Sequence, residues 1–193
     1  MAGKPQTLAT TSAFEILGPV MVGPSSSHTA GALRCAQVAA SLLEGRITKV
    51  TFGLWNSFAH TYRGHGTDRA LVAGALGLSP QDERLRTSFD IAKERGLQYD
   101  FYLTELPDAH ENSVKMTFTH PDGSTLDVVG ASLGGGRILI TRIGEYAAEI
   151  TADAPTLVIA HQDKRGMVST VTHILASNGL NIGVMRLSRT ARG

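Results

Sequence analysis

Residues able to do chemistry gather in the segment from Gly23 to Thr29, which reads Gly-Pro-Ser-Ser-Ser-His-Thr and precedes a run of small apolar residues. A helix N-cap uses one hydroxyl, whereas this segment brings four hydroxyls and an imidazole to one helix entrance. Free backbone amides and the positive end of the helix dipole would make the same entrance a seat for a carboxylate or a phosphate. A cap with a buried histidine is the simpler interpretation, but the extra hydroxyls favour a ligand site.

A second polar cluster is the loop Gly64-His65-Gly66-Thr67-Asp68. Glycines on both sides of His65 let the backbone come close to a ligand, and an imidazole is a good general base at neutral pH. Thr67 or Asp68 could cap the helix that follows. A glycine turn with a surface histidine explains the loop equally well, so both interpretations stay open at this point.

Weaker candidates lie elsewhere in the chain. The segment His110-Glu111-Asn112-Ser113 precedes a predicted strand and could lend polar contacts to a site. The glycine run 134–136 lacks the Gly-Lys-Ser/Thr ending of a phosphate-binding loop, so we interpret it as a turn or bulge. The one cysteine, Cys35, lies among small apolar residues and is interpreted as a buried hydrophobe. A single thiol cannot build a disulfide framework, a zinc site or an iron–sulfur cluster within this chain.

The elements that must position these residues follow from hydrophobic periodicity and turn signals. Helices are predicted over 25–43, 67–76, 79–95 and 167–175, each followed closely by a glycine. Strands are predicted over 47–54, 113–119, 126–128, 138–143, 156–161 and 181–187. The strand over 113–119 alternates cleanly and forms a hairpin with the next one. A boundary is predicted near 151–155, and the β-α-β unit beyond it is too small to bury a core by itself.

Composition narrows the class of protein. The 193-residue chain has 42% hydrophobic residues and a formal net charge of +1, which argues against disorder and against binding to polyanions. Charged residues make up 18% and glycines number 21, which suits a compact enzyme or binding domain with many tight turns. No apolar run is long enough to cross a bilayer, and there is no basic-apolar leader, so we expect a cytoplasmic protein.

Four motifs, taken in order, resemble the beta chain of the bacterial iron–sulfur-dependent L-serine dehydratase family. They are Gly-Pro-Ser-Ser-Ser-His-Thr, Gly-His-Gly-Thr-Asp, His-x-Asn-Ser-Val and Ala-Ser-x-Gly-Gly-Gly. The tail, with Gly179-Leu180-Asn181-Ile182, resembles the first half of an ACT module, a ferredoxin-like fold that senses amino acids. The resemblance covers roughly Phe14 to Arg189 and implies an α/β (α+β) fold. It implies a flexible tail over 1–12, an allosteric-substrate-binding-like domain over 13–150 and a partial ACT domain over 156–193.

The family converts L-serine to pyruvate and ammonia, so the resemblance implies one subunit of an L-serine ammonia-lyase. The family's [4Fe-4S] cluster acts as a Lewis acid on the substrate hydroxyl. In two-chain members its cysteines belong to the alpha chain, so no metal ligand is expected here. The resemblance implies a hetero-oligomer with that alpha chain, acting on L-serine, with neither nucleic acid nor membrane as a partner. Self-association through this chain is a second expectation.

By the same resemblance, His65 is the candidate base for the α-proton of serine, with Thr67 beside it. The serine carboxylate and amine would be held across a chain interface by Ser25, Ser26, Ser27, His28 and Thr29. Asn112 and Ser113 would line the same cleft.

In the tail, the resemblance makes Asp163, Gly166 and Asn181 the candidate effector-binding residues. Arg165 stands where ACT modules usually carry proline, and the second half of the ACT fold is missing from the sequence. Effector binding by this chain is therefore in question.

A different class of protein fits part of the pattern. A non-catalytic amino-acid-binding regulatory module, of the kind attached to phosphoglycerate dehydrogenase, would share the fold and the ACT-like tail. Such a module has no need for a glycine-flanked histidine beside a cluster of hydroxyls. An inactive fragment is a third interpretation. The two polar loops are the feature that favours the enzyme.

Overall fold

The computed structural model describes residues 20–188, so the predicted tail over 1–12 lies outside the described residues. Its main feature is a six-stranded sheet with the order β2-β1-β3-β4-β5-β6. The strands are β1 Lys49–Leu54, β2 Gln98–Leu103, β3 Ser113–Thr119, β4 Thr125–Gly134, β5 Arg137–Ile143 and β6 Tyr146–Ile150. The helices are η1 Ser26–Gly31, α2 Ala32–Ser41, α3 Asn56–Thr61, α4 Thr67–Ala75, η2 Glu83–Thr87, α5 Ser88–Glu94 and α6 Met167–Ser177. The prediction of a mixed α/β fold is confirmed.

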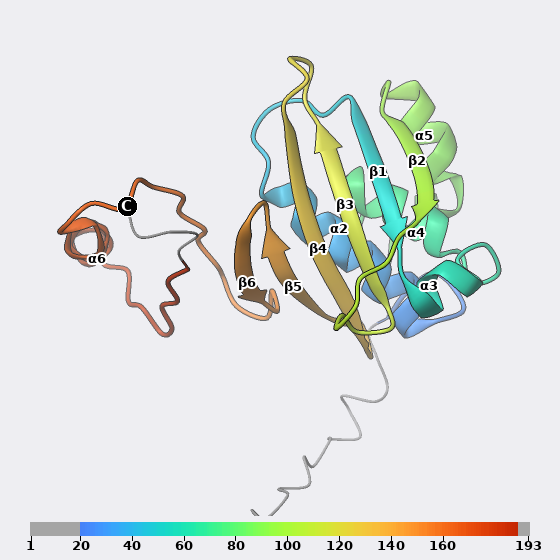
Figure 1. Cartoon of the computed structure of the whole chain (residues 1–193). Helices are drawn as coiled ribbons and strands as arrows, with labels where there is room; N and C mark the ends of the chain where they lie inside the picture. Colours follow the sequence, from blue (N-terminus) through green and yellow to red (C-terminus); the bar gives the residue numbers. More distant parts are fainter. Residues whose placement is uncertain (1–19, 189–193) are drawn as a thin grey trace, which may run out of the picture.

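One face of the sheet carries the core. Helices α2, α4 and α5 lie behind the sheet in the view of Figure 1. Alternate apolar residues of β1 and β3 point to this side and pair across the two strands: Leu54 with Val114, Phe52 with Met116, and Val50 with Phe118. All six side chains are buried, as the clean alternation over 113–119 predicts. The predicted hairpin of β3 and β4 is also confirmed.

Strand direction brings the polar motifs to one edge of the sheet. Strands β1 and β2 are parallel, and every other neighbouring pair is antiparallel. The carboxyl ends of β1 and β4 therefore lie beside the amino end of β3. The helix α3 follows β1 at this edge, which is the lower edge in Figure 1. Asn112 precedes β3, and the glycine run 134–136 connects β4 to β5, which confirms it as a turn.

Several boundaries differ from the sequence prediction. The stretch after β1 forms the short helix α3, and the predicted helix over 79–95 is divided into η2 and α5. Strand β6 was not predicted. Its residues, Tyr-Ala-Ala-Glu-Ile, do not alternate between apolar and polar types, and it is placed by pairing with β5. Within residues 20–188, no helix is both long and apolar enough to cross a membrane.

The two strands predicted beyond the boundary are wrong. Residues 156–161 and 181–187 have no strand assignment, whereas the predicted helix between them is present as α6. A strand needs a partner for its backbone groups, and the described chain offers none to either segment. Their apolar side chains are consequently exposed: Leu157 by 67% and Val184 by 77%. The partial ACT domain over 156–193 stays a prediction.

Candidate active site

The helix entrance at 25–31 is capped by one serine. Ser25 has extended backbone angles, and its hydroxyl accepts a hydrogen bond from the His28 amide at 3.0 Å. The first turn, η1, is π-helical, and the amides of Thr29 and Ala30 both donate to the Ser25 carbonyl, at 2.9 and 3.3 Å. A serine cap is therefore confirmed. It uses one of the four hydroxyls and leaves the others for different contacts.

The His28 ring is held at both nitrogens. The Ser27 hydroxyl lies 3.0 Å from Nδ1, and the Ser57 hydroxyl lies 2.9 Å from Nε2. The ring also packs edge-on against Phe58, with 5.4 Å between centroids. Burial lowers the pKa of His28 below its ordinary value, the neighbouring His65 lowers it further, and Glu111 partly opposes both. His28 is accordingly held in a fixed orientation, and its surroundings favour the neutral ring.

The two polar motifs of the sequence meet at His65. Its ring lies against the His28 ring, with 4.9 Å between centroids and an interplanar angle of 69°. The Thr29 hydroxyl donates to the His65 carbonyl at 2.9 Å, and the His65 amide donates to the Thr61 carbonyl at 3.1 Å. The backbone of His65 is thus tied to the helix entrance, while its side chain is exposed. A surface histidine held in this way can meet a ligand.

Thr67 lies beside this pair but does not cap α4. Gly66 occupies the N-cap position with a left-handed backbone (φ 68°) that favours glycine. The prediction that Thr67 or Asp68 caps the helix is therefore wrong for Thr67, and for Asp68 the carboxylate only accepts from the next amide, that of Arg69. Burial raises the pKa of Asp68 above its usual range. Thr67 is fully buried, and its hydroxyl has no hydrogen-bond partner among the described residues.

The segment before β3 lies at the same edge. The Asn112 amide donates to Nδ1 of His110 at 3.1 Å, and the Ser113 hydroxyl donates to the His110 carbonyl at 2.6 Å. The Glu111 carbonyl accepts from the Ser57 amide at 3.0 Å, which ties this segment to α3. The Ser113 hydroxyl is therefore engaged within the protein. Asn112 is buried, and its side-chain oxygen has no hydrogen-bond partner within residues 20–188.

Ser132, near the end of β4, is a further polar residue at this edge of the sheet. Its amide donates to the Asn112 carbonyl at 3.0 Å. Its buried hydroxyl lacks a hydrogen-bond partner among the described residues. The same is true of the Thr67 hydroxyl and the Asn112 side-chain oxygen. A Cβ at Gly31 would lie 2.0 Å from the Ser132 hydroxyl, so only glycine lets η1 approach β4 this closely. An unpaired buried polar group costs about 1–3 kcal/mol, so each of these three groups calls for an explanation, and a functional role is one.

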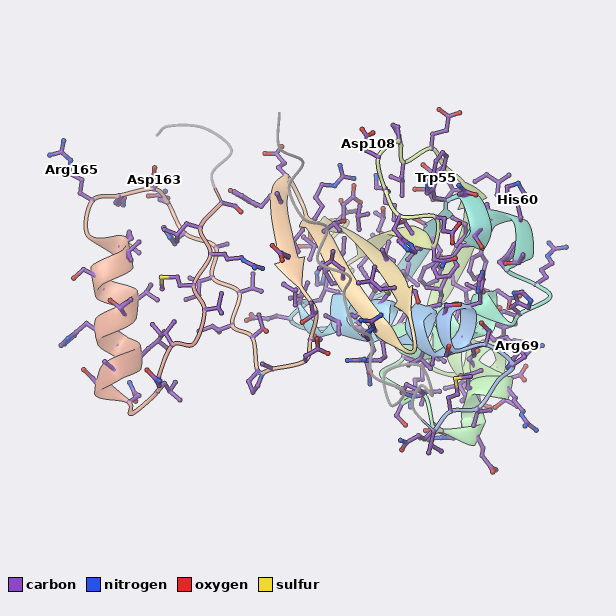
Figure 2. The ribbon with its side chains drawn as sticks, turned by 90° about the horizontal axis from the view of Figure 1, so that it is seen from below. Trp55, His60, Arg69, Asp108, Asp163 and Arg165 are labelled. Carbon is purple, nitrogen blue, oxygen red and sulfur yellow. The ribbon has the colours of Figure 1, made fainter. Side chains whose placement is uncertain are left out.

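Sequence reasoning missed two residues of this site, Ser57 and Ser132. Ser57 follows a buried strand in the stretch Trp55-Asn56-Ser57, and polar residues directly after such a strand were the available signal. Ser132 belongs to the motif Ala-Ser-x-Gly-Gly-Gly, of which only the glycines were weighed. Figure 2 shows Trp55 and His60 at the end of the domain that carries α3.

The candidate effector residues lie elsewhere and do not converge. Asp163 and Gly166 precede α6, whereas Asn181 follows its other end, next to Leu180, whose amide bonds the Leu175 carbonyl. The helix between them has 11 residues and is about 16 Å long. Figure 2 shows Asp163 and Arg165 in the tail, away from Trp55 and His60. An effector site built from these three residues stays a prediction.

The described residues do not fit an iron–sulfur cluster. A [4Fe-4S] cluster takes four cysteine thiolates, and Cys35 is the one cysteine of the chain. It is fully buried on α2, and burial raises the pKa of its thiol to about 12. Within residues 20–188 there is also no group of three or more side chains placed to hold a metal ion. A [4Fe-4S] cluster would therefore need ligands from elsewhere.

The inertness of Cys35 can be tested directly. At pH 8, with a pKa of about 12, about one thiol in ten thousand is ionised, and the side chain is buried. We expect the native chain to resist iodoacetamide and to be alkylated once unfolded in urea, as followed by mass spectrometry. The variant Ser41→Cys, at an exposed position of the same helix, is the matched control and should react in the native state. Equal native reaction rates for Cys35 and the control cysteine would contradict the buried-hydrophobe interpretation.

The chain is similar to known proteins over most of its length. Residues 12–142 match the family described as serine dehydratase beta chain. The chain is 48% identical over 172 residues to the L-serine dehydratase beta chain of Peptoniphilus asaccharolyticus, which covers 89% of this chain and 78% of that protein. It is 39% identical over 178 residues to the probable L-serine dehydratase beta chain of Bacillus subtilis, with coverages of 92% and 80%. A weaker similarity, 28% over 157 residues, links it to D-3-phosphoglycerate dehydrogenase of Synechocystis, with coverages of 77% and 27%.

Proposed function

Because the chain belongs to the serine dehydratase beta-chain family, we propose that it is the beta subunit of an L-serine dehydratase, an L-serine ammonia-lyase. The reaction converts L-serine to pyruvate and ammonia. The family match covers the domain that carries both polar motifs. The beta-chain names of two relatives support an alpha chain as the partner.

The observation that carries this proposal is the contact between His28 and His65 at a hydroxyl-rich helix entrance. His65 is the base that takes the α-proton of serine, because its ring is exposed and its backbone is anchored. His28 and Thr29 position His65, since both ring nitrogens of His28 and the Thr29 hydroxyl are already engaged within the protein. Thr67 supports the same loop from the first turn of α4.

The substrate carboxylate lies at the start of η1. The first amides of a helix have no intrahelical partner, so they can donate hydrogen bonds to the substrate carboxylate. The hydroxyls of Ser25 and Ser27 line this entrance. Within the described residues, the Ser26 hydroxyl has no hydrogen-bond partner, so it is the one most available to a ligand. Asn112, with its unpaired buried side-chain oxygen, offers an acceptor on the β3 side of the edge.

The cluster of the family is held by the alpha chain in this proposal. The single buried cysteine of this chain supports that assignment. When bound there, the cluster supplies a Lewis acid for the substrate hydroxyl. The edge that carries His65 and η1 then faces the alpha chain, and the substrate lies between the two chains.

A regulatory module is the second candidate. The similarity to D-3-phosphoglycerate dehydrogenase covers 77% of this chain and favours it. Identity to the beta chains is higher, at 48% and 39%. A regulatory module would bind an amino acid without needing an exposed histidine packed against a second one. The enzyme therefore remains the better-supported function.

Reconstitution tests the proposed function. The chain is co-expressed with the alpha chain, purified anaerobically and supplied with L-serine, and pyruvate is followed through lactate dehydrogenase. We expect pyruvate from the pair and none from this chain alone. Amino-acid binding without turnover, measured by calorimetry in the presence of the alpha chain, would support the regulatory module instead.

If the start of η1 binds the substrate carboxylate, Ser26→Ala should weaken substrate binding. A hydrogen bond to a charged group is worth about 1.5–3 kcal/mol, so KM for L-serine should rise roughly 10–100-fold with kcat nearly unchanged. The control is Ser41→Ala, which removes an exposed hydroxyl that bonds the Val38 carbonyl, away from the site. Steady-state kinetics of the reconstituted pair measure both constants. A lower kcat at unchanged KM would instead place the Ser26 contact in the transition state.

A further inference from the structure

Ser57 is the residue of the site that no sequence motif singled out. Its hydroxyl lies 2.9 Å from Nε2 of His28, 29 residues away in the sequence. We infer that Ser57 is a positioning residue, which acts on the reaction through His28 by holding that ring against His65. The inference rests on the proposed function, in which His65 is the base.

The backbone of Ser57 is fixed on three sides. Its amide donates to the Glu111 carbonyl at 3.0 Å, and its carbonyl accepts from the Thr61 hydroxyl at 2.8 Å. The next residue, Phe58, is fully buried and anchors α3 in the core. The Ser57 hydroxyl is therefore presented from a rigid backbone, as a positioning group must be.

We assign one direction to the hydrogen bonds around His28, starting from the one whose donor is fixed. The His28 amide donates to the Ser25 hydroxyl oxygen, which leaves the Ser25 proton free to donate to Ser27, 3.3 Å away. In the order that we infer, the Ser27 hydroxyl donates to Nδ1 and the ring donates its Nε2–H to the Ser57 hydroxyl. Bonds aligned in this sense strengthen one another. This order selects the Nε2–H tautomer of His28 and makes Ser57 its acceptor.

A fixed His28 ring matters because His65 has few other contacts. The ring of His65 is exposed and packs on His28 at 4.9 Å between centroids. If His28 turns about its side-chain bonds, the surface that orients His65 turns with it. A misplacement of about 1 Å in a catalytic group can lower turnover by roughly 100-fold. Loss of the Ser57 hydroxyl should therefore displace His65 indirectly, through movement of the His28 ring.

Loss of the Ser57 hydroxyl should also change the pKa of His28. His65 and Glu111 are the titratable side chains whose charges act on it, the first lowering its pKa and the second raising it, while burial lowers it most. The imidazolium form of His28 would donate a stronger hydrogen bond to Ser57 than the neutral ring does. Removing the Ser57 hydroxyl should therefore lower the pKa of His28 further.

The first experiment reads His28 in the full chain without a partner. Ring nitrogen signals are followed by NMR from pH 4.5 to 8, and His28→Gln assigns them by their loss. In the wild-type chain we expect the Nε2–H tautomer. In Ser57→Ala we expect a mixture of tautomers and the lower pKa, whereas Ser57→Thr, which keeps a hydroxyl, should restore the wild-type values. Ser41→Ala is the matched control, and circular dichroism confirms that each variant is folded. Wild-type tautomer and pKa values in a folded Ser57→Ala would overturn the inference.

The second experiment uses the chain reconstituted with its alpha chain. Ser57→Ala should lower kcat about 10–100-fold with little change in KM, and Ser57→Thr should recover most of the loss. Wild-type kcat in Ser57→Ala would overturn the inference even if the His28 pKa had moved. The proposed function fails by a separate outcome, in which the wild-type chain gives no pyruvate with the alpha chain.

Discussion

Replacing His65 with alanine is expected to lower kcat of the reconstituted enzyme by roughly 10²–10⁴-fold, the usual contribution of a positioned general base. The α-proton of serine is weakly acidic, so its removal needs a base at a fixed place. The loop that carries His65 is anchored through backbone groups, by Thr29 and Thr61, and not through the imidazole. The substitution therefore removes the base without removing the contacts that hold the loop.

A matched histidine serves as the control for this prediction. His60 is also exposed, lies nearby on α3, and bonds the Asn56 carbonyl through Nδ1 at 2.7 Å. His60→Ala should retain kcat within about a factor of three, since among residues 20–188 its ring forms no hydrogen bond or ring contact with His28 or His65. Co-purification of the alpha chain and the absorbance of the cluster show whether assembly is intact. Near-normal turnover in an assembled His65→Ala enzyme would move the base to another residue, and His28 would be tested first.

The sheet was predictable wherever the pattern was local. The alternation over 113–119 and the turn after it define β3 and its hairpin because period-2 patterns directly state which face is buried. The helices α2 and α4 follow from runs of small apolar residues ended by glycine. Strand β6 pairs with β5 in a local hairpin across the turn 144–145, and it was missed because its own residues do not alternate between apolar and polar types.

In the tail, by contrast, two strands were predicted that the structure does not contain. Residues 156–161 and 181–187 have strand-like composition, but a strand is defined by its hydrogen-bonded partner, and the described chain supplies none. Among the described residues, polar contacts join the end of the second segment and the next residue to β6: Arg186 pairs with Glu149 at 2.9 Å, and the Ser188 hydroxyl donates to the Ala147 carbonyl at 2.8 Å. Composition alone could not reveal this difference.

The site was predictable in its parts and not in its assembly. Each polar motif is a local signal, and the types of residue in it already pointed to a base and an anion seat. The contact of His28 with His65 depends on how α2 packs against α4, which no local pattern states. Thr29 illustrates the limit. The family resemblance assigned its hydroxyl to the substrate, which stays a prediction, and in the structure this hydroxyl donates to the His65 carbonyl.

That packing provides the second large effect, expected in Gly74→Ala. A Cβ at Gly74 would lie 2.2 Å from the Leu33 carbonyl oxygen, 2.8 Å from the Ala36 Cβ and 2.9 Å from the Gln37 amide. These atoms belong to the backbone or to the first side-chain carbon of α2, so they cannot turn aside, and the two helices must separate. Overpacking of this kind costs about 1–3 kcal/mol, and more where backbone must move. We expect a loss of about 3 kcal/mol in the free energy of unfolding, measured by urea denaturation of the isolated chain.

Intrinsic propensity makes the Gly74→Ala result decisive, because alanine in a helix interior is favoured over glycine by about 1 kcal/mol. Without the steric contact the variant would be more stable than the wild type. Gly64→Ala is the control: its new Cβ would lie an ordinary 3.7 Å from the Thr61 carbonyl oxygen, so its unfolding free energy should change by less than about 1 kcal/mol. Since α2 continues η1 and α4 follows the His65 loop, helix separation should also weaken the His28–His65 contact. We therefore expect a lower kcat from the fraction of Gly74→Ala that folds and assembles. Wild-type stability and turnover in this variant would show that the close approach of α2 and α4 does not set the site.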